Sequence, residues 1–234
     1  MSRDRPFDLV IFDLDGTLVD SVADIARALN TALAGANLPP LPLGTVSRFV
    51  GDGAAKLIER ASPPVLAARE QQAALLARFM AAYTANVCVE SRLYPGVADL
   101  LGALGHAGVT AAVLTNKPGN LARELLRALG AADHFVAVIG DGDGFPRKPD
   151  PTAARQVMQR AGANASRSAV LGDGLPDIRL AHAVPCAAIA ASWGYTSTTA
   201  LEAEQPTFLA ATVQEAASLL LPIRPPLPDQ NVDV

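Results

Sequence analysis

Acidic residues follow two short apolar segments that are typical of buried strands. Asp13 comes directly after the segment 7–12 and Asp15 two residues later, while Asp173 follows the segment 168–171. Carboxylate oxygens are the ligands that hard divalent cations such as Mg²⁺ prefer. Paired carboxylates without a cation repel one another, which raises their pKa values. The spacing therefore predicts a metal-dependent site that includes these three acids.

Further polar side chains follow predicted strands and suit a phosphoryl group. Thr115 and Asn116 end the second predicted strand, where a hydroxyl and a backbone N–H are able to hold phosphoryl oxygens. Lys148 follows the third predicted strand, and Asp177 lies one helical turn after Asp173. Taken singly, each residue is as well explained as a helix cap or a solvated side chain. Together they indicate a divalent cation and a phosphoryl group bound at one edge of a sheet.

The elements that position these side chains are predicted from an alternation of strand and helix patterns from residue 95 onward. Such alternation predicts an α/β fold with a doubly wound parallel sheet, in which ligands bind outside the carboxyl ends of the strands. The expected strands are 7–12, 109–114, 135–139, 168–171 and 186–190, and the expected helices are 97–107, 119–129, 151–161 and 175–183. A last short strand and a helix are expected within 207–221.

The segment after the first strand interrupts this alternation, because it is rich in Ala and Leu and carries helical spacing without a strand pattern. Asp20 or Ser21 is the expected N-cap of its first helix. The expected helices of this segment are 21–34, 44–61 and 63–87. The sequence thus divides into an α/β core at 1–16 and 91–222, a helical cap inserted after the first strand at 17–90, and a loosely ordered Pro-rich tail at 223–234.

The composition narrows the class of protein. About half of the 234 residues are hydrophobic, which excludes a disordered or fibrous chain, yet no run of about 18 residues is apolar enough to span a membrane. A net charge of −4 without a Lys/Arg block argues against a nucleic-acid partner. The N-terminus lacks the apolar region of a signal peptide, and the two cysteines lack CxxC spacing. We therefore expect a cytoplasmic protein.

Four segments in order resemble the signatures of the haloacid dehalogenase superfamily, and within it the phosphoglycolate phosphatase-like branch. They are FDLDGTLVDS at 12–21, LTNKP at 114–118, KPDP at 148–151 and GDGLPDI at 172–178. The chain departs from the common pattern at Gly174, where relatives often have Ser, and at Val184-Pro185, where they often have Ala-Gly. Neither departure affects a carboxylate. The resemblance implies a Rossmann-like core with a helical cap.

The resemblance also implies roles for the acids. By similarity, Asp13 is the nucleophile that forms an aspartyl-phosphate, and Asp15 is the general acid and base. Mg²⁺ would be held by a carboxylate oxygen of Asp13, the backbone carbonyl of Asp15 and the carboxylate of Asp173. The implied reaction is the Mg²⁺-dependent hydrolysis of a small phosphorylated metabolite, with 2-phosphoglycolate as the first expectation.

Roles for the remaining strand-end residues follow from the same resemblance. Thr115 and the Asn116 amide would bind phosphoryl oxygens, and Lys148 would neutralise both the phosphate and the Asp13 carboxylate. Asp177 would orient Lys148 or a metal-bound water. Its alternative explanation is an acid favoured by a helix N-terminus.

The cap would close over the sheet edge and choose the substrate. A turn at 48–53 that contains Gly51, together with Lys56, is the expected substrate-binding part, in which Arg48 or Lys56 meets a substrate carboxylate. The alternative is that both cations are solvated. Trp193 and Tyr195 either line the site, pack in the core or form a subunit contact, and the protein is expected to be a monomer or a homodimer.

Several alternative functions use the same core. Pyrophosphate, a sugar phosphate or a nucleotide could replace 2-phosphoglycolate as substrate, and a hexose phosphate mutase shares the whole set of core residues. A 2-haloacid dehalogenase is disfavoured by Asp15, and a phosphonatase-like hydrolase would need Lys56 as a Schiff base. A non-catalytic binding protein is disfavoured because all three acids are present.

Overall fold

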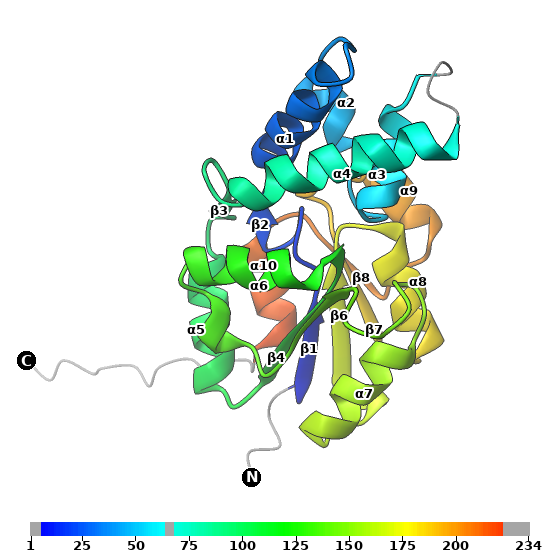
Figure 1. Ribbon diagram of the computed structural model, residues 1–234. Coiled ribbons are helices and arrows are strands. Elements are labelled where there is room, and N and C mark those ends of the chain that lie inside the picture. The colour runs from blue at the N-terminus through cyan, green and yellow to red at the C-terminus, as the bar shows by residue number, and fades with distance from the viewer. Residues whose placement is uncertain (1–5, 64–67, 222–234) are drawn as a thin grey trace, which may run out of the picture.

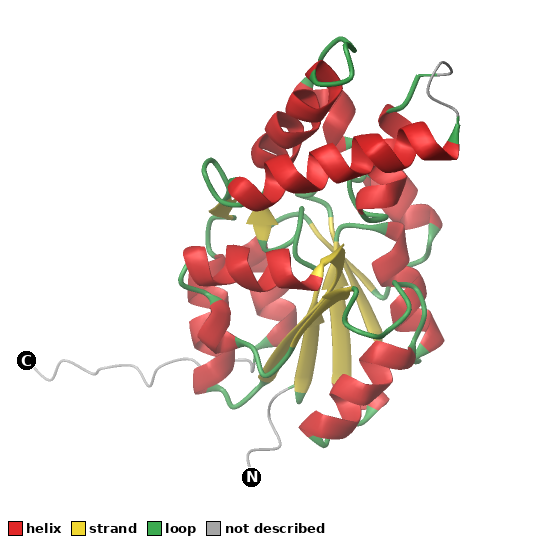
Figure 2. Cartoon of the chain, in the orientation of Figure 1, coloured by secondary structure: helices red, strands yellow, loops and turns green. Residues whose placement is uncertain are grey.

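Six parallel strands form the centre of the computed structural model, which describes residues 6–63 and 68–221 (Figures 1 and 2). Their order in the sheet is β5-β4-β1-β6-β7-β8. The predicted doubly wound α/β fold is confirmed. The strands are β1 (Leu9–Phe12), β4 (Thr110–Pro118), β5 (Val138–Asp141), β6 (Ser168–Gly172), β7 (Ala187–Ala191) and β8 (Phe208–Ala210).

Helices cover both faces of the sheet, which is why its central strand is continuously apolar. Val10 and Phe12 of β1 belong to one buried cluster, whereas Leu9 and Ile11, which point to the opposite face, belong to another. The first cluster includes α5 (Val97–His106), α6 (Gly119–Ala128) and α10 (Val213–Leu220). The second includes α7 (Thr152–Ala161), α8 (Leu175–Ala183) and α9 (Thr198–Ala203).

The strand order reverses at β1. This strand pairs with β4 on one side, where Phe12 lies opposite Val113, and with β6 on the other, where Phe12 lies opposite Leu171. The carboxyl ends of β4, β1 and β6 therefore lie next to each other. Sheets of this kind bind their ligands in the crevice outside such a reversal point.

A layer of helices lies above these strand ends (Figure 1). It comprises α1 (Val22–Ala34), α2 (Leu43–Ser47), α3 (Ala54–Ala61) and α4 (Arg69–Ala85), and it is called the cap below. The chain leaves and re-enters the core through two short strands, β2 (Val19–Asp20) and β3 (Arg92–Leu93). These two strands pair antiparallel with each other, so both crossings lie side by side.

The sequence prediction was wrong on several element bounds. The helix expected at 44–61 is split into α2 and α3, because the backbone reaches φ +120° at Gly51 and φ +87° at Gly53, values that a helix does not allow. Ser21 occupies the N-cap position of α1, but its side chain does not cap the helix. The expected tail at 223–234 lies outside the described residues.

Among the residues described, no helix is both long and apolar enough to cross a membrane. Cys88 and Cys186 are both free thiols.

Candidate active site

A buried lysine joins two carboxylates where β1 and β6 end. The Lys148 ammonium lies 2.7 Å from an oxygen of Asp13 and 2.6 Å from Oδ1 of Asp177. All three side chains are almost fully buried. Asp13 is fixed from the backbone as well, because its N–H donates to Leu171 O at 2.9 Å. The structure thus brings together three of the residues expected at the site.

Asn116 holds the loop that carries Lys148. Its Oδ1 accepts the Lys148 N–H at 2.9 Å, and its Nδ2 donates to Lys148 O at 3.4 Å. The same Nδ2 donates to Gly51 O of the cap at 3.0 Å. The expected role of Asn116 lay in its backbone amide, whereas the side chain connects the lysine loop to the cap.

Asp173 is held by a different set of donors. Thr17 Oγ1 donates to Asp173 Oδ1 at 2.8 Å, and the Tyr195 N–H donates to Oδ2 at 2.8 Å. Gly16 packs against this carboxylate with φ +87°, and a Cβ at this position would lie 2.3 Å from Asp173 Oδ2. The Gly that follows Asp15 in the sequence is therefore required both by its backbone conformation and by the close approach of Asp173.

The charges of this cluster suit a divalent cation. Asp13, Asp173 and Asp177 each offer an oxygen, and these oxygens lie within 4.8 Å of one another. Burial, and then the negative charge of Asp13, raise the pKa of Asp173. Burial opposes the charge of Lys148, but Asp13 and Asp177 raise its pKa. When all three carboxylates are ionised, they and the one ammonium leave two uncompensated negative charges, which a hard cation with oxygen ligands would balance. The donor set therefore fits Mg²⁺.

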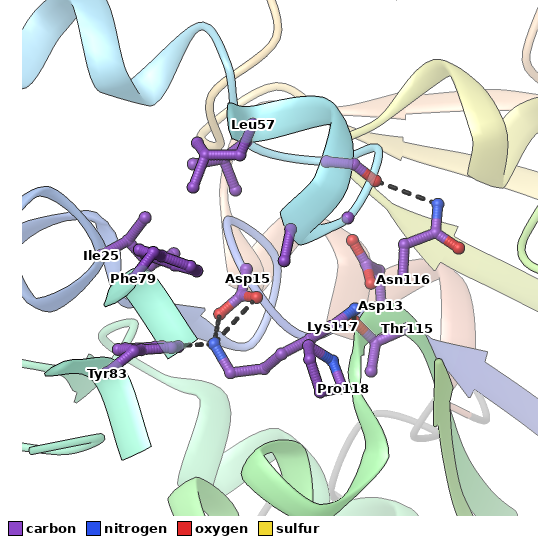
Figure 3. A pocket seen from close by; sticks show the side chains of 14 residues that line it. Asp13, Asp15, Ile25, Leu57, Phe79, Tyr83, Thr115, Asn116, Lys117 and Pro118 are labelled. Atoms are coloured by element: carbon purple, nitrogen blue, oxygen red, sulfur yellow. Dashed lines mark hydrogen bonds and ion pairs between the residues drawn. The ribbon is translucent and has the colours of Figure 1, made fainter. Parts of the chain in front are cut away.

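The Asp15 side chain is not part of that cluster, because its carboxylate forms an ion pair with Lys117 (Figure 3). Lys117 Nζ lies 3.0 Å from Asp15 Oδ1 and 3.1 Å from Oδ2. Ser21 Oγ donates to Asp15 Oδ1 at 2.5 Å, so this hydroxyl is engaged and does not cap α1. Lys117 also donates to the hydroxyl of Tyr83 on α4.

Lys117 and Tyr83 are site residues that the sequence interpretation missed. One signal was available for Lys117, since it lies in the LTNKP segment, two residues after Thr115. For Tyr83 no such signal existed, because it lies in a helix of the cap, far from every motif in the sequence.

A cavity separates the cap from the strand ends (Figure 3). Its volume is about 50 Å³. The cap contributes mostly apolar side chains, and the core contributes nearly all of the polar ones. The lining includes Ile25, Gly51, Leu57, Phe79 and Tyr83 from the cap, and Asp13, Asp15, Thr115, Asn116 and Lys117 from the core.

The two cap cations expected to meet the substrate do not line the cavity in this structure. Arg48 is exposed and donates to Thr45 Oγ1 at 3.4 Å, whereas Lys56 forms a surface ion pair with Glu59 at 2.6 Å. Neither side chain lines the cavity, but Gly51 of the same turn does.

Trp193 and Tyr195 tie the core to the entry of the cap and do not line the cavity. Trp193 Nε1 donates to Thr17 O at 3.1 Å. The Tyr195 hydroxyl accepts the Ser21 N–H at 2.9 Å and the Val22 N–H at 3.1 Å. Tyr195 thereby accepts two N–H groups at the start of α1 that lack a helical partner.

Comparisons with known proteins agree with this geometry. The family model of the haloacid dehalogenase-like hydrolases matches residues 7–184. The chain is 40% identical over 193 residues to a phosphoglycolate phosphatase of Rhodospirillum rubrum, with 80% of each chain covered. It is 37% identical over 228 residues to a phosphoglycolate phosphatase of Yersinia pseudotuberculosis, which covers 95% of this chain and 96% of that one.

Solved structures share the fold. A crystal structure from Haemophilus somnus, described as a predicted phosphoglycolate phosphatase, is 31% identical with a TM-score of 0.81, covering 87% of this chain and 93% of that one. A structure from Lactobacillus delbrueckii reaches a TM-score of 0.86 at 24% identity, covers 92% and 98% of the two chains, and supports the fold alone. By its family match and its relatives, this chain belongs to the haloacid dehalogenase-like hydrolases.

Proposed function

We propose that this protein is a Mg²⁺-dependent phosphatase that hydrolyses 2-phosphoglycolate through an aspartyl-phosphate intermediate. The enzyme class is that of the phosphoric monoester hydrolases, to which its curated relatives belong. The observation that carries the proposal is the buried cluster of Asp13, Lys148, Asp177 and Asp173 at the reversal point of the sheet.

In the first half of the reaction, a carboxylate oxygen of Asp13 attacks phosphorus. The bond between phosphorus and the ester oxygen breaks, and the departing glycolate oxygen takes a proton from Asp15. Lys148 neutralises the charge of Asp13 and of the phosphoryl group as they approach each other. Thr115, which lines the cavity, donates to a phosphoryl oxygen.

In the second half, water replaces the phosphoryl group on Asp13. Asp15, now a carboxylate, takes a proton from the water, whose oxygen attacks phosphorus. The bond between phosphorus and Asp13 breaks, inorganic phosphate leaves, and both acids return to their starting states. Asp177 is a positioning residue in both halves, because it holds the Lys148 ammonium from the side opposite Asp13.

The ligands proposed for Mg²⁺ are a carboxylate oxygen of Asp13, the backbone carbonyl of Asp15 and the carboxylate of Asp173. When bound, the ion offsets the negative charge of the acids and of the phosphoryl group. Asp173 accepts hydrogen bonds from Thr17 Oγ1 and from the Tyr195 N–H, one at each carboxylate oxygen. Both oxygens keep lone pairs that could bind a cation.

The size of the cavity favours a short substrate. The cavity, of about 50 Å³, lies beneath apolar cap side chains such as Leu57 and Phe79, which favours a small substrate over a nucleoside or a hexose. We propose that the cap acts as a lid, which moves away from the strand ends to admit the substrate and closes to exclude water.

The proposal is tested by phosphate release from a panel of phosphorylated metabolites, with Mg²⁺ and with EDTA. We expect hydrolysis that requires Mg²⁺ and that Asp13→Asn reduces by at least about 10³-fold, because the nucleophile is lost. Activity that survives Asp13→Ala would refute the mechanism. A preference of more than about tenfold for pyrophosphate or a hexose phosphate would refute the substrate.

The cellular setting belongs to the proposal too. Two free thiols suit the reducing conditions of the cytoplasm, and we propose that location. A monomer or a homodimer is proposed, and sedimentation of the purified protein distinguishes the two.

A further inference from the structure

Lys117 is the only lysine or arginine among the described residues that line the cavity. Its ammonium is fully buried between Asp15 of the core and Tyr83 of the cap. The mechanism proposed above gives this residue no role, because it assigns the charge of Asp13 and of the phosphoryl group to Lys148. A buried ammonium at the wall of a substrate cavity is a partner for an anionic group of the substrate.

Among the described residues that line the cavity, no other cationic side chain is available for a second negative charge. The cap side chains nearest the cavity, among them Ile25, Leu57 and Phe79, are apolar. Arg48 and Lys56 lie on the surface and do not reach it. A carboxylate that entered this cavity unpaired would lose its hydration without compensation, which is strongly unfavourable. The remaining cation available to it is Lys117.

Lys117 already has a carboxylate partner, so binding requires an exchange. It contacts both oxygens of Asp15, at 3.0 and 3.1 Å. The ion pair with Asp15 compensates the charge of this buried ammonium. The Tyr83 ring lies beneath the ammonium at 4.5 Å and the hydroxyl accepts from it. These contacts from α4 hold the lysine in place while its carboxylate partner changes.

We propose that Lys117 recognises the carboxylate of the substrate and exchanges Asp15 for it. The exchange frees the Asp15 carboxylate from its ion pair and leaves it held by Ser21 alone among its side-chain partners. A phosphomonoester with a carboxylate next to the ester carbon thus frees the Asp15 side chain, which its own hydrolysis needs, from the ion pair with Lys117. This inference rests on the proposed function, and it assigns substrate choice to a core lysine and a cap tyrosine.

The test compares 2-phosphoglycolate with ethyl phosphate, which carries a methyl group in place of the carboxylate. For the wild type we expect kcat/KM to favour 2-phosphoglycolate by at least about 30-fold, the usual effect of a buried ion pair. We also expect a lower kcat for ethyl phosphate, and not only a higher KM, because Asp15 stays paired with Lys117. Equal kcat values for the two substrates would refute the exchange.

Lys117→Met should reduce the preference to within about threefold, while Lys117→Arg, which keeps the cation, should retain most of it. The matched control is Lys56→Met, the same substitution at a surface lysine, which should leave the preference at its wild-type value. If Lys117→Met lowers kcat/KM equally for both substrates, so that the preference persists, the lysine only supports the structure and the inference is wrong.

A milder variant covers the case in which Lys117→Met does not fold, as judged by its thermal melting. Tyr83→Phe removes only the hydroxyl that contacts Lys117, and we expect the preference to fall by about threefold or more. An unchanged preference in this variant refutes the inference. The proposed function fails separately, if the wild type releases no phosphate from either substrate or if Asp13→Asn remains active on both.

Discussion

Two of the three lysines of this chain, Lys117 and Lys148, are buried at the site, and each holds a different acid. Lys148 lies between Asp13 and Asp177, whereas Lys117 pairs with Asp15. The proposed nucleophile and the proposed acid and base therefore have separate counter-charges. Asp13 can therefore keep its ion pair with Lys148 while Asp15 exchanges its partner Lys117.

Asp177 provides a test at this scale, because it lies beside Lys148 and also accepts the Gly174 N–H at 3.0 Å. We expect Asp177→Asn to lower kcat by about 10- to 100-fold, since an amide holds the ammonium less firmly. Because its proposed role is positioning, KM and the Mg²⁺ concentration for half-maximal activity should change by less than about threefold. A large rise in the Mg²⁺ requirement would show instead that Asp177 is a metal ligand.

The strand-end residues could be predicted because a parallel sheet brings the carboxyl ends of its strands to one edge. Asp13, Thr115 and Asp173 follow from this rule alone. The pairing of Lys117 could not be predicted, since a long side chain takes the partners that the cap provides, and the position of α4 depends on packing between distant segments. For the same reason the sequence does not reveal that Arg48 donates to Thr45 and does not line the cavity.

At the scale of elements, Asp24 joins the two crossings between core and cap. This fully buried residue in the first turn of α1 accepts the N–H groups of Val89, Glu90 and Ser91, at 2.8 to 3.1 Å, and the Ser91 hydroxyl at 2.6 Å. The segment that leads into β3 is thereby attached to the helix that follows β2. Sequence patterns gave no indication of this contact, because it joins residues about 65 positions apart.

Asp24→Asn is expected to destabilise the protein by about 2–4 kcal/mol at pH 7, because an amide cannot accept all of these hydrogen bonds. Burial opposes ionisation of Asp24, but the bonds from Ser91, Val89 and Glu90 lower its pKa. A lowered pKa contributes stability above the unfolded value of about 3.9, and this contribution is lost as the pH falls through the folded value. The difference between variant and wild type should therefore shrink below about pH 4.

Urea unfolding at pH 7, 5 and 3.5 measures this difference. Asp99→Asn is the matched control, since Asp99 is an exposed acid in the first turn of α5, and it should change the stability by less than about 0.5 kcal/mol. A difference for Asp24→Asn that grows as the pH falls would contradict the assignment.

The accuracy of the element predictions follows from length and pattern. The alternation of β4 to β8 with their helices extends over more than a hundred residues, so the sheet could be predicted. The strands β2 and β3 have two residues each, which is too short for any periodicity to show. The break between α2 and α3 depends on two glycines with positive φ, whose backbone conformation a helical apolar pattern does not reveal.

For the whole molecule, the metal should stabilise the fold in a pH-dependent way. Burial, with the charge of Asp13, raises the pKa of Asp173, so its ionised form opposes folding of the metal-free protein above the unfolded pKa. Mg²⁺ binds the ionised form and must displace a proton below the raised pKa. We expect the increase in Tm on adding about 10 mM Mg²⁺ to be larger at pH 8 than at pH 6.

Thermal melting with Mg²⁺ and with EDTA at the two pH values provides the measurement. Asp173→Asn should lose most of the Mg²⁺-dependent increase at both. An increase that is larger at pH 6, or one that the variant keeps in full, would show that Mg²⁺ stabilises the protein elsewhere.

The pairing of β2 with β3 has a consequence for how such proteins diversify. Because β2 and β3 pair with each other, the two ends of the inserted segment lie side by side. An insert of a different length would therefore not change the distance between the core strands that it connects. A helical layer of another size or composition could replace residues 22–85 without moving Asp13 or its neighbours. New substrates are then reached by exchanging one contiguous piece of chain, while the chemistry is inherited unchanged.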